Sequence, residues 1–338
     1  MGKRNGQTMI LDSRIAPIAA ASIAGPAEAR GQLRGLFDHT IQDDLWDQKS
    51  WEMAESKLFY EAVRKAIEKS GRESSEMGFL LGGDLLNQLI AATFAAREIA
   101  VPFLGLYGAC STMAESLVVG SMLLEGGFAE YLVCCASSHF STAERQYRFP
   151  LEMGTQKTPS QQRTATGAGA TILSNCEDKG VFITHVTPGK VVDYGVADAN
   201  NMGAAMAPAA YDTIKTHFKD THTTEADFDA IYTGDLGKLG LSILRDMMAN
   251  DGAEDMTKFH DCGAELYFPE QDTHMGGSGC GCAAITLSAK LLPNLWEGRW
   301  QRLLFVPTGA LLSTTSAMQG NSIPGIAHAV RFERGTVR

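Results

Sequence analysis

The sequence predicts an α/β fold made of two related halves, each with a mixed sheet covered by helices. Three observations lead to this prediction. Short apolar runs alternate with helical segments, a cysteine lies between one such run and a helix, and the pattern of the first half returns in the second. Short apolar strands separated by helices are typical of sheets that are covered on both faces.

The duplication rests on the order of the segments as well as on their residues. An offset of 172 residues places Cys110 on Cys282. Asp84 and Asp235 are only 151 residues apart, so the second half carries 21 extra residues between its carboxylate and its cysteine. We therefore predict two units, residues 1–175 and 176–338. The echoing segments are 81–85 with 232–236, the cysteine segment 107–116 with 279–284, and 131–138 with 303–310.

In the first half, strands are predicted where apolar residues run together and helices where they recur with helical spacing. The helix at 49–69 has a broad apolar face, and Gly71 is expected to end it. The run at 101–106 is expected to be a buried strand. The predicted elements are strands at 7–24, 79–84, 101–106 and 131–139, and helices at 49–69, 87–99 and 117–124.

The second half follows a polar segment, 145–163, which contains two prolines and is expected to leave the sheet. The strand at 182–192 is expected to run antiparallel to its neighbours. The elements predicted from here on are strands at 164–173, 182–192 and 303–310, and helices at 211–219 and 241–250.

Cys110 is the first candidate functional residue, because it lies where the apolar strand turns into a helix. Gly108 and Ala109 allow a sharp turn there. Free N–H groups and the positive end of the helix dipole meet at such a position. They lower the pKa of a thiol and attract anions. A small buried residue that only fills a tight corner is the structural alternative.

Composition excludes several classes of protein. The net charge of −10 argues against binding to nucleic acid or to an anionic membrane surface. No apolar run approaches the length of a spanning helix, and the N-terminus lacks the apolar core of a secretory signal. The seven cysteines are scattered, as in a chain with reduced thiols, and their spacing does not predict a metal site or a cofactor.

Polar residues follow the predicted strands in both halves. In open α/β sheets, ligands bind at the carboxyl ends of the strands, so we expect these residues to meet in one central pocket. Asp84 has a second interpretation, because it can cap the helix that follows it. The candidate ligand-binding residues are Asp84, Cys110, Ser137, Ser138, His139, Ser141 and Asp235.

A duplicated layout with a cysteine at a strand–helix elbow resembles the thiolase and ketoacyl-ACP synthase superfamily. Several long, irregularly spaced segments go further and resemble the stage V sporulation protein AD family. The resemblance runs from about residue 6 to Glu333. It implies a thiolase-like fold and a ligand, dipicolinic acid (pyridine-2,6-dicarboxylic acid), that is taken up into the developing spore and released at germination. The segments are 51–55, 83–88, 108–112, 137–139, 142–146, 202–210, 276–280 and 308–313.

Two functions compete. An acyl-transferring condensing enzyme would use Cys110 as nucleophile and would need a base and oxyanion donors. The resemblance implies a histidine in the second half, and this chain has Asp235 there instead. A nearby carboxylate raises the pKa of a thiol. His139 is the strongest substitute for that base, and His260 and His274 are the others.

The second function is ligand binding without catalysis, which we expect because the usual catalytic partners are missing. Dipicolinate is a planar dianion, so it needs donors. Backbone N–H groups at the elbow and the hydroxyl groups of the candidate site supply them. Asp84 and Asp235 suit such an anion if calcium accompanies it or if one carboxyl is protonated, and calcium prefers carboxylate ligands.

The resemblance also implies a setting for the protein. Its partners would be the membrane proteins encoded with it, and it would lie peripherally at the inner membrane of the forespore and spore. Thiolase-like proteins pair through an edge strand near the elbow. We therefore expect a homodimer through the segment at 101–106, and no nucleic-acid partner.

Overall fold

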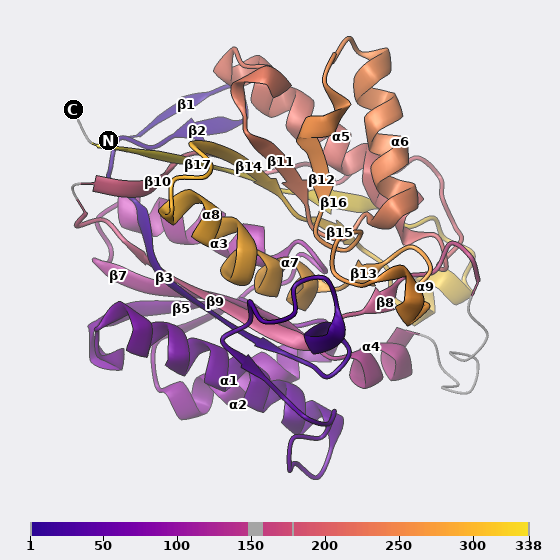
Figure 1. The fold of residues 1–338 in the computed structure, drawn as a ribbon, viewed down its shortest axis with the longest axis horizontal. Helices are drawn as coiled ribbons and strands as arrows, with labels where there is room; N and C mark the ends of the chain where they lie inside the picture. Colours follow the sequence, from indigo (N-terminus) through magenta and orange to yellow (C-terminus); the bar gives the residue numbers. More distant parts are fainter. Residues whose placement is uncertain (1, 148–157, 178, 337–338) are drawn as a thin grey trace.

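The computed structural model describes residues 2–147, 158–177 and 179–336, and in this part of the chain helices and sheets alternate in layers (Figure 1). Helices α1 and α2 cover the outer face of one sheet, α3, α7 and α8 lie between the two sheets, and α5 and α6 cover the other sheet. The bounds are α1 (Trp51–Ser70), α2 (Ile90–Ile99), α3 (Thr112–Glu125), α5 (Met202–Thr221), α6 (Gly237–Asn250), α7 (Cys280–Thr286) and α8 (Leu292–Trp296).

The first sheet has the strand order β4-β3-β9-β7-β5-β6. β9 runs antiparallel to both of its neighbours, whereas β7, β5 and β6 are parallel. The carboxyl ends of these parallel strands therefore meet at one edge. The bounds are β3 (Ala16–Ala24), β4 (His39–Thr40), β5 (Met77–Gly83), β6 (Phe103–Gly105), β7 (Tyr131–Ser138) and β9 (Gly167–Ser174).

The second sheet has the order β1-β2-β10-β17-β14-β11-β12. Its last five strands, β10-β17-β14-β11-β12, match β3-β9-β7-β5-β6 of the first sheet one by one. In both sheets the strands of a half have the spatial order 1-5-4-2-3 when they are numbered along the chain, and they run in the same relative directions. This confirms the duplicated α/β fold. The bounds are β1 (Lys3–Asn5), β2 (Thr8–Ile10), β10 (Lys179–Thr187), β11 (Ala230–Thr233), β12 (Phe259–Asp261), β14 (Arg302–Val306) and β17 (Ala329–Thr336).

The N-terminal hairpin crosses between the halves. β1 and β2 are the first strands of the chain, yet β2 pairs with β10 of the second sheet. The hydroxyls of Thr8 and Thr187 are 2.8 Å apart, and the Asp220 carboxylate accepts the N–H groups of Gln7 and Thr8. The division of the chain at residue 175 stays a prediction, because sheet membership alone does not define a domain.

Local signals in the sequence placed several boundaries correctly. The Ser50 hydroxyl accepts the N–H of Met53 and so caps α1, which ends where Gly71 adopts a left-handed conformation with φ of 69°. Short elements complete the described residues: α4 (Phe140–Tyr147), α9 (Thr314–Met318), β8 (Arg163–Thr164), β13 (Gly277–Ser278), β15 (Thr308–Ala310), β16 (Gly325–Ala327) and a π-helical turn at Leu287–Leu291.

Several predicted strands differ from the structure. The segment 7–24 forms β2 and β3, and the segment 303–310 forms β14 and β15, and the members of each pair belong to different sheets. The run at 101–106 forms only the three-residue β6, which is an edge strand, and its Leu104 is 42% exposed instead of buried. The strand at 182–192 ends at Thr187, because Pro188 follows and has no N–H for a ladder. Part of the predicted excursion, 148–157, lies outside the described residues. Within those residues, no helix is both long enough and apolar enough to cross a bilayer.

We propose that two copies of the chain pair through β6. Leu104 on this edge strand is exposed, and so is Phe94 on α2 beside it. An exposed apolar edge strand is a template for pairing with another chain. Light scattering at micromolar concentration should give a mass near twice the 36.3 kDa of one chain.

Leu104→Lys should shift the protein toward the single-chain mass, because it places a charge at the edge. Met318→Lys is the matched control, since Met318 is an exposed apolar residue of α9 and should leave the mass unchanged. A parent protein that is monomeric at this concentration would contradict the proposal.

Candidate functional site at the cysteine elbow

The elbow before α3 is a tight turn that the second half of the chain holds in place. Ala109 has φ of 49°, an uncommon value for a residue with a side chain. The Thr112 hydroxyl accepts the N–H of Gly108 and donates to the carbonyl of Ala109. Gly309 of β15 packs against this turn so closely that a Cβ atom there would lie 2.2 Å from the Gly108 carbonyl oxygen. Only glycine allows this approach.

Cys110 lies at the elbow as predicted, and its thiol contacts a carboxyl group from the other half. The thiol is buried and lies beside the Asp235 carboxyl group. Burial raises the pKa of Cys110 well above its ordinary value, and the Asp235 carboxyl raises it further. This is the opposite of the pKa reduction expected from the helix start alone. The thiol is therefore protonated at neutral pH and is a poor nucleophile.

Asp235 follows β11 and is held by three donors. Its Oδ2 atom accepts the Ser278 hydroxyl and the Gly279 N–H, each at 3.0 Å, and its Oδ1 atom accepts the Thr308 hydroxyl at 3.0 Å. The Cys110 thiol lies close to this carboxyl group. Burial raises the pKa of Asp235 to about 6 in spite of these bonds.

Asp84 has the capping role that its position allowed. Its carboxylate accepts the backbone N–H groups of Leu86 and Ala92, both at 2.7 Å, and so joins the end of β5 to the start of α2. In the second half, Asp261 accepts the N–H groups of Leu236 and Gly237 at the start of α6. Asp84 and Asp235 match in sequence but differ in role, because Asp261 caps the second-half helix.

Ser137 is hydrogen-bonded to the buried carboxyl group of Glu55, which was not among the predicted site residues. Its hydroxyl donates to Glu55 of α1 at 3.3 Å, and its carbonyl accepts the Cys280 thiol at 2.8 Å. Glu55 is completely buried and also bonds to the Thr142 hydroxyl at 2.7 Å. The carboxyl groups of Glu55, Asp84 and Asp235 all raise the pKa of the Cys280 thiol. The two halves therefore contribute to one group of buried carboxyls, Glu55, Asp84 and Asp235, which we call the acidic centre.

Ser138, His139 and Ser141 are engaged within the protein. The Ser138 hydroxyl donates to the Ala165 carbonyl and accepts the Gly281 N–H. His139 is buried, its Nε2 atom is 2.7 Å from the Asp44 carbonyl oxygen, and its Nδ1 atom accepts the N–H of Ser141. These partners fix the neutral tautomer with the proton on Nε2. The lone pair on Nδ1 is engaged by the N–H of Ser141, and burial also lowers the pKa of His139, so this side chain is a poor base.

The other two candidate histidines are also engaged elsewhere. His260 stacks on Tyr232 and bonds to Glu265 through Nδ1 at 2.9 Å. His274 has its Nδ1 atom 3.9 Å from the Asp272 carboxylate. Neither histidine contributes to the pKa of Cys110, whose causes are burial, Asp235, Cys280 and Gly279.

A cavity of about 470 Å³ opens beside the elbow. The hydroxyls of Tyr107 and Tyr147 are 3.2 Å apart in its wall, and Tyr147 donates to the Leu85 carbonyl. The thiols of Cys110 and Cys280 contribute to the raised pKa of both tyrosines, so the pair lies near the acidic centre. The lining residues among those described carry no charge: Leu85, Leu86, Asn87, Gln88, Leu89, Tyr107, Gln146, Tyr147, Leu311, Leu312, Ser313 and Ser316.

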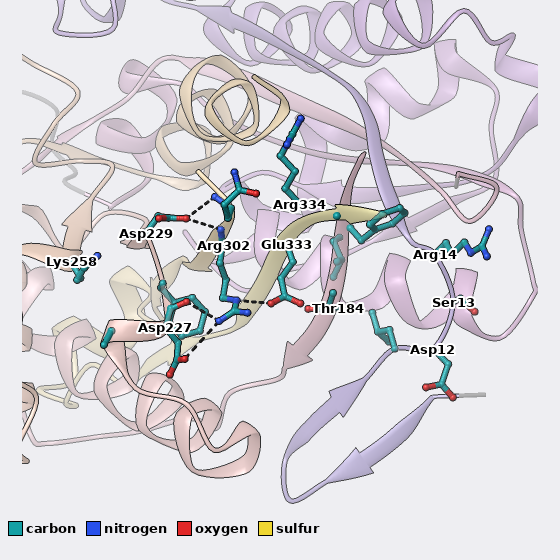
Figure 2. A pocket seen from close by; sticks show the side chains of 17 residues that line it. Asp12, Ser13, Arg14, Thr184, Asp227, Asp229, Lys258, Arg302, Glu333 and Arg334 are labelled. Atoms are coloured by element: carbon teal, nitrogen blue, oxygen red, sulfur yellow. Dashed lines mark hydrogen bonds and ion pairs between the residues drawn. The ribbon is translucent and has the colours of Figure 1, made fainter. Parts of the chain in front are cut away.

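A larger cavity, of about 660 Å³, lies at the opposite ends of the strands and does not form a convergent site (Figure 2). Arg302 at the start of β14 is paired with Asp227 and Glu333, and Asp229 accepts the N–H of Arg302. Figure 2 shows Arg334 pointing away from this cluster. We therefore place the functional site at the elbow.

Comparison with known proteins agrees with this geometry. The sequence profile described as stage V sporulation protein AD matches residues 5–333. The chain is 45% identical over 328 residues to the stage V sporulation protein AD of Bacillus subtilis (strain 168), which covers 97% of each chain. The chain belongs to the stage V sporulation protein AD family.

Solved structures show the fold of this family member to be thiolase-like. Human mitochondrial 3-ketoacyl-CoA thiolase in complex with CoA aligns with a TM-score of 0.61 at 12% identity, covering 97% of this chain and 99% of the other. The synthase FabH of Pseudomonas aeruginosa aligns with a TM-score of 0.57 at 13% identity, covering 96% of this chain and 100% of the other. A variant of Xanthomonas campestris OleA aligns with a TM-score of 0.62 at 14% identity, covering 96% of this chain and 99% of the other.

Several features of this family member's site carried no sequence signal. Glu55 lies on the apolar face of α1, so a carboxylate among apolar positions was the one available hint. Cys280 was visible only as part of the repeated elbow. Tyr107 and Tyr147 become neighbours only in the fold. Among the described residues, no group of three or more His, Cys, Asp or Glu side chains is arranged to hold a metal ion.

Glu55 should make the protein less stable as pH rises. Burial and the Asp84 carboxyl raise the pKa of Glu55 from 4.5 to about 8. The folded state therefore holds a proton that the unfolded chain releases, and the free energy of unfolding falls between these pH values by at most ~1.4 kcal/mol per pH unit. Glu55→Gln should remove this contribution. Denaturant unfolding at about pH 5.5 and about pH 8 measures it.

Glu68→Gln is the control for that measurement, because Glu68 lies on the same helix with an exposed side chain. It should keep the parent's pH dependence. If Glu55→Gln does the same, Glu55 is ionised in the folded protein and the expectation is wrong.

Proposed function

We propose that this protein binds dipicolinic acid on a non-catalytic thiolase-like scaffold and so serves its uptake into the developing spore and its release at germination. The observation that carries the proposal is that the Cys110 thiol is buried beside the Asp235 carboxyl group, and both burial and this carboxyl raise the pKa of the thiol. An acidic group thus stands where acyl transfer needs a base. Among the described residues, the neighbours of this thiol keep the proton on sulfur and do not activate it.

The histidines support the same reading. An acyl transfer through Cys110 needs a group that removes the thiol proton. His139 donates through one ring nitrogen and accepts through the other, and both partners are backbone groups. Among the described residues, His139 is therefore not available to remove the proton of the Cys110 thiol, and the site is better suited to binding than to acyl transfer.

The cavity beside the elbow suits a small planar anion. Its volume of about 470 Å³ is within the usual range of ligand pockets. The Asn87 amide offers an N–H donor, and leucines offer flat apolar contacts. Gln146 and Tyr147 donate to the Leu85 carbonyl, and Tyr107 is bonded to Tyr147, so these side chains shape the wall. We place the ligand in this cavity with one carboxylate toward the elbow. The cavity wall is then supported from behind by Ser137, Ser138 and His139. Their polar groups are bonded within the protein and do not contact the ligand in this proposal.

A calcium ion that accompanied the ligand would gain little from the two aspartates. Both oxygens of Asp84 accept N–H groups, and both oxygens of Asp235 accept hydrogen bonds. We therefore propose that dipicolinate binds without calcium. Titration by calorimetry, with and without calcium, tests both statements, and equal affinities are the expected result.

The cellular setting is part of the same proposal. The chain belongs to a sporulation family, and we propose that it acts peripherally at the inner membrane of the forespore and spore, with the membrane proteins encoded beside it as partners. The net charge of −10 favours attachment through those proteins over direct attraction to anionic lipid.

Substitutions at Cys110 should separate ligand binding from folding. Cys110→Ala should weaken dipicolinate binding only modestly, because the backbone of the elbow stays in place. Cys110→Asp should weaken it strongly, since a charge about 4 Å from a ligand carboxylate costs about 4 kcal/mol at an effective dielectric constant near 20. Affinity and melting temperature are measured on the same samples. Parent-like affinity in Cys110→Asp would place the ligand elsewhere.

The enzymatic alternative, a thiolase or ketoacyl synthase-type acyltransferase with Cys110 as nucleophile and His139 as its base, has its own test. Incubation with acyl-CoA followed by mass spectrometry should show no acyl group on Cys110, because its thiol stays protonated. A stoichiometric adduct that turns over would show that the protein is an acyltransferase and would refute the non-catalytic proposal.

A further inference from the structure

Among the residues that the structure describes, the acidic centre at the elbow has no cationic partner. Asp235, Asp84 and Glu55 are all buried there. The hydrogen-bond partners of the three carboxyls are backbone N–H groups and hydroxyls. The cavity beside them has no charged residue among those described. Within the described part of the chain, a dianion that enters therefore meets negative charge that protons can neutralise.

The partners of each carboxyl decide which one can hold a proton. Both oxygens of Asp84 accept backbone N–H groups, so protonation would cost one of these bonds. The Oδ1 atom of Asp235 faces the Thr308 hydroxyl at 3.0 Å, which can accept as well as donate. Oδ2 can meanwhile keep the N–H of Gly279. Asp235 can thus be neutral without losing a hydrogen bond. Burial also raises the pKa of Asp84 to about 6, but a proton on Asp84 would cost one of its two backbone bonds.

Glu55 already holds a proton by the same reasoning. The Thr142 hydroxyl lies 2.7 Å from Glu55 and 3.0 Å from the His139 carbonyl oxygen, which can only accept. The hydroxyl has a single proton. When that proton goes to the carbonyl, the Glu55 carboxyl must supply the proton of the other bond.

We propose that dicarboxylate binding at the elbow is coupled to uptake of a proton by Asp235. This inference rests on the proposed function and adds its regulation: the protein takes up ligand and proton together and releases both as the surroundings become more alkaline. The proton comes from solvent and bonds to Oδ1, and no other bond forms or breaks.

The groups that face Asp235 support this coupling from each side. Cys110 lies at the start of α3, Cys280 and Cys282 lie on α7, and Asp261 lies on β12, and none of them is a cation. Burial raises the pKa of Asp235 to about 6, so the free protein carries it mostly ionised at neutral pH. A ligand carboxylate nearby raises this pKa further and draws in the proton.

The test measures dipicolinate affinity of the full chain from about pH 6.5 to about pH 8.5, where both ligand carboxyls are ionised. If one proton enters with the ligand, the Kd should rise about tenfold per pH unit. Calorimetry in phosphate and in Tris buffer should also give different heats, corresponding to uptake of about one proton per ligand.

Asp235→Asn mimics the neutral form and should bind with an affinity nearly independent of pH, with no net proton uptake. Glu55→Gln is the matched control, because it neutralises a buried carboxyl that is already protonated, and it should keep the tenfold slope over the lower half of this range. If Asp235→Asn fails to fold, the proton count of the parent decides alone.

A pH-independent Kd with equal heats in both buffers would overturn the coupling and leave the binding function in place. A parent-like slope in folded Asp235→Asn would overturn the assignment to this residue. Absence of dipicolinate binding at every pH would overturn the proposed function and this inference with it.

Discussion

The contact between Asp235 and Cys110 is the interaction on which the site depends, because it joins the two halves at the point where their strand ends meet. Asp235 belongs to the second half and Cys110 to the first. The carboxyl is completely buried, and neutral groups alone donate to it. A buried acid without a cation is costly, so its position must be fixed by many bonds. Those bonds also fix the thiol.

The duplication explains why this carboxyl is available. In the first half, Asp84 follows β5 and caps the next helix. In the second half, Asp235 follows β11, and Asp261 of β12, the strand equivalent to β6, caps α6. Asp235 is thereby released from capping and faces the elbow. One duplicated residue thus caps a helix in one half and lies beside the cysteine elbow in the other.

Much of the fold could be predicted from local signals, and the site could be predicted only in part. Apolar runs indicated the strands, Gly71 indicated the end of α1, and the repeated order of the segments indicated the duplication. The exposure of Leu104 could not be predicted, because an edge strand and a central strand share the same apolar composition. The site residues were placed at the correct strand ends, but Glu55 comes from a distant helix, and spacing along the chain carries no information about such a contact.

The N-terminal hairpin has a consequence for how the chain acquires its structure during synthesis. β2 pairs with β1, but the strand that joins this hairpin to the second sheet is β10, beyond residue 179. The first strands to leave the ribosome therefore belong to the sheet that is completed last. The first sheet, from Ala16 to Ser174, can assemble while the hairpin waits unpaired. Pairing over such a separation in sequence is slow. The closing of the second sheet on the N-terminal hairpin is therefore expected to be a late folding step, and the exposed Lys3 and Arg4 keep the waiting strand soluble.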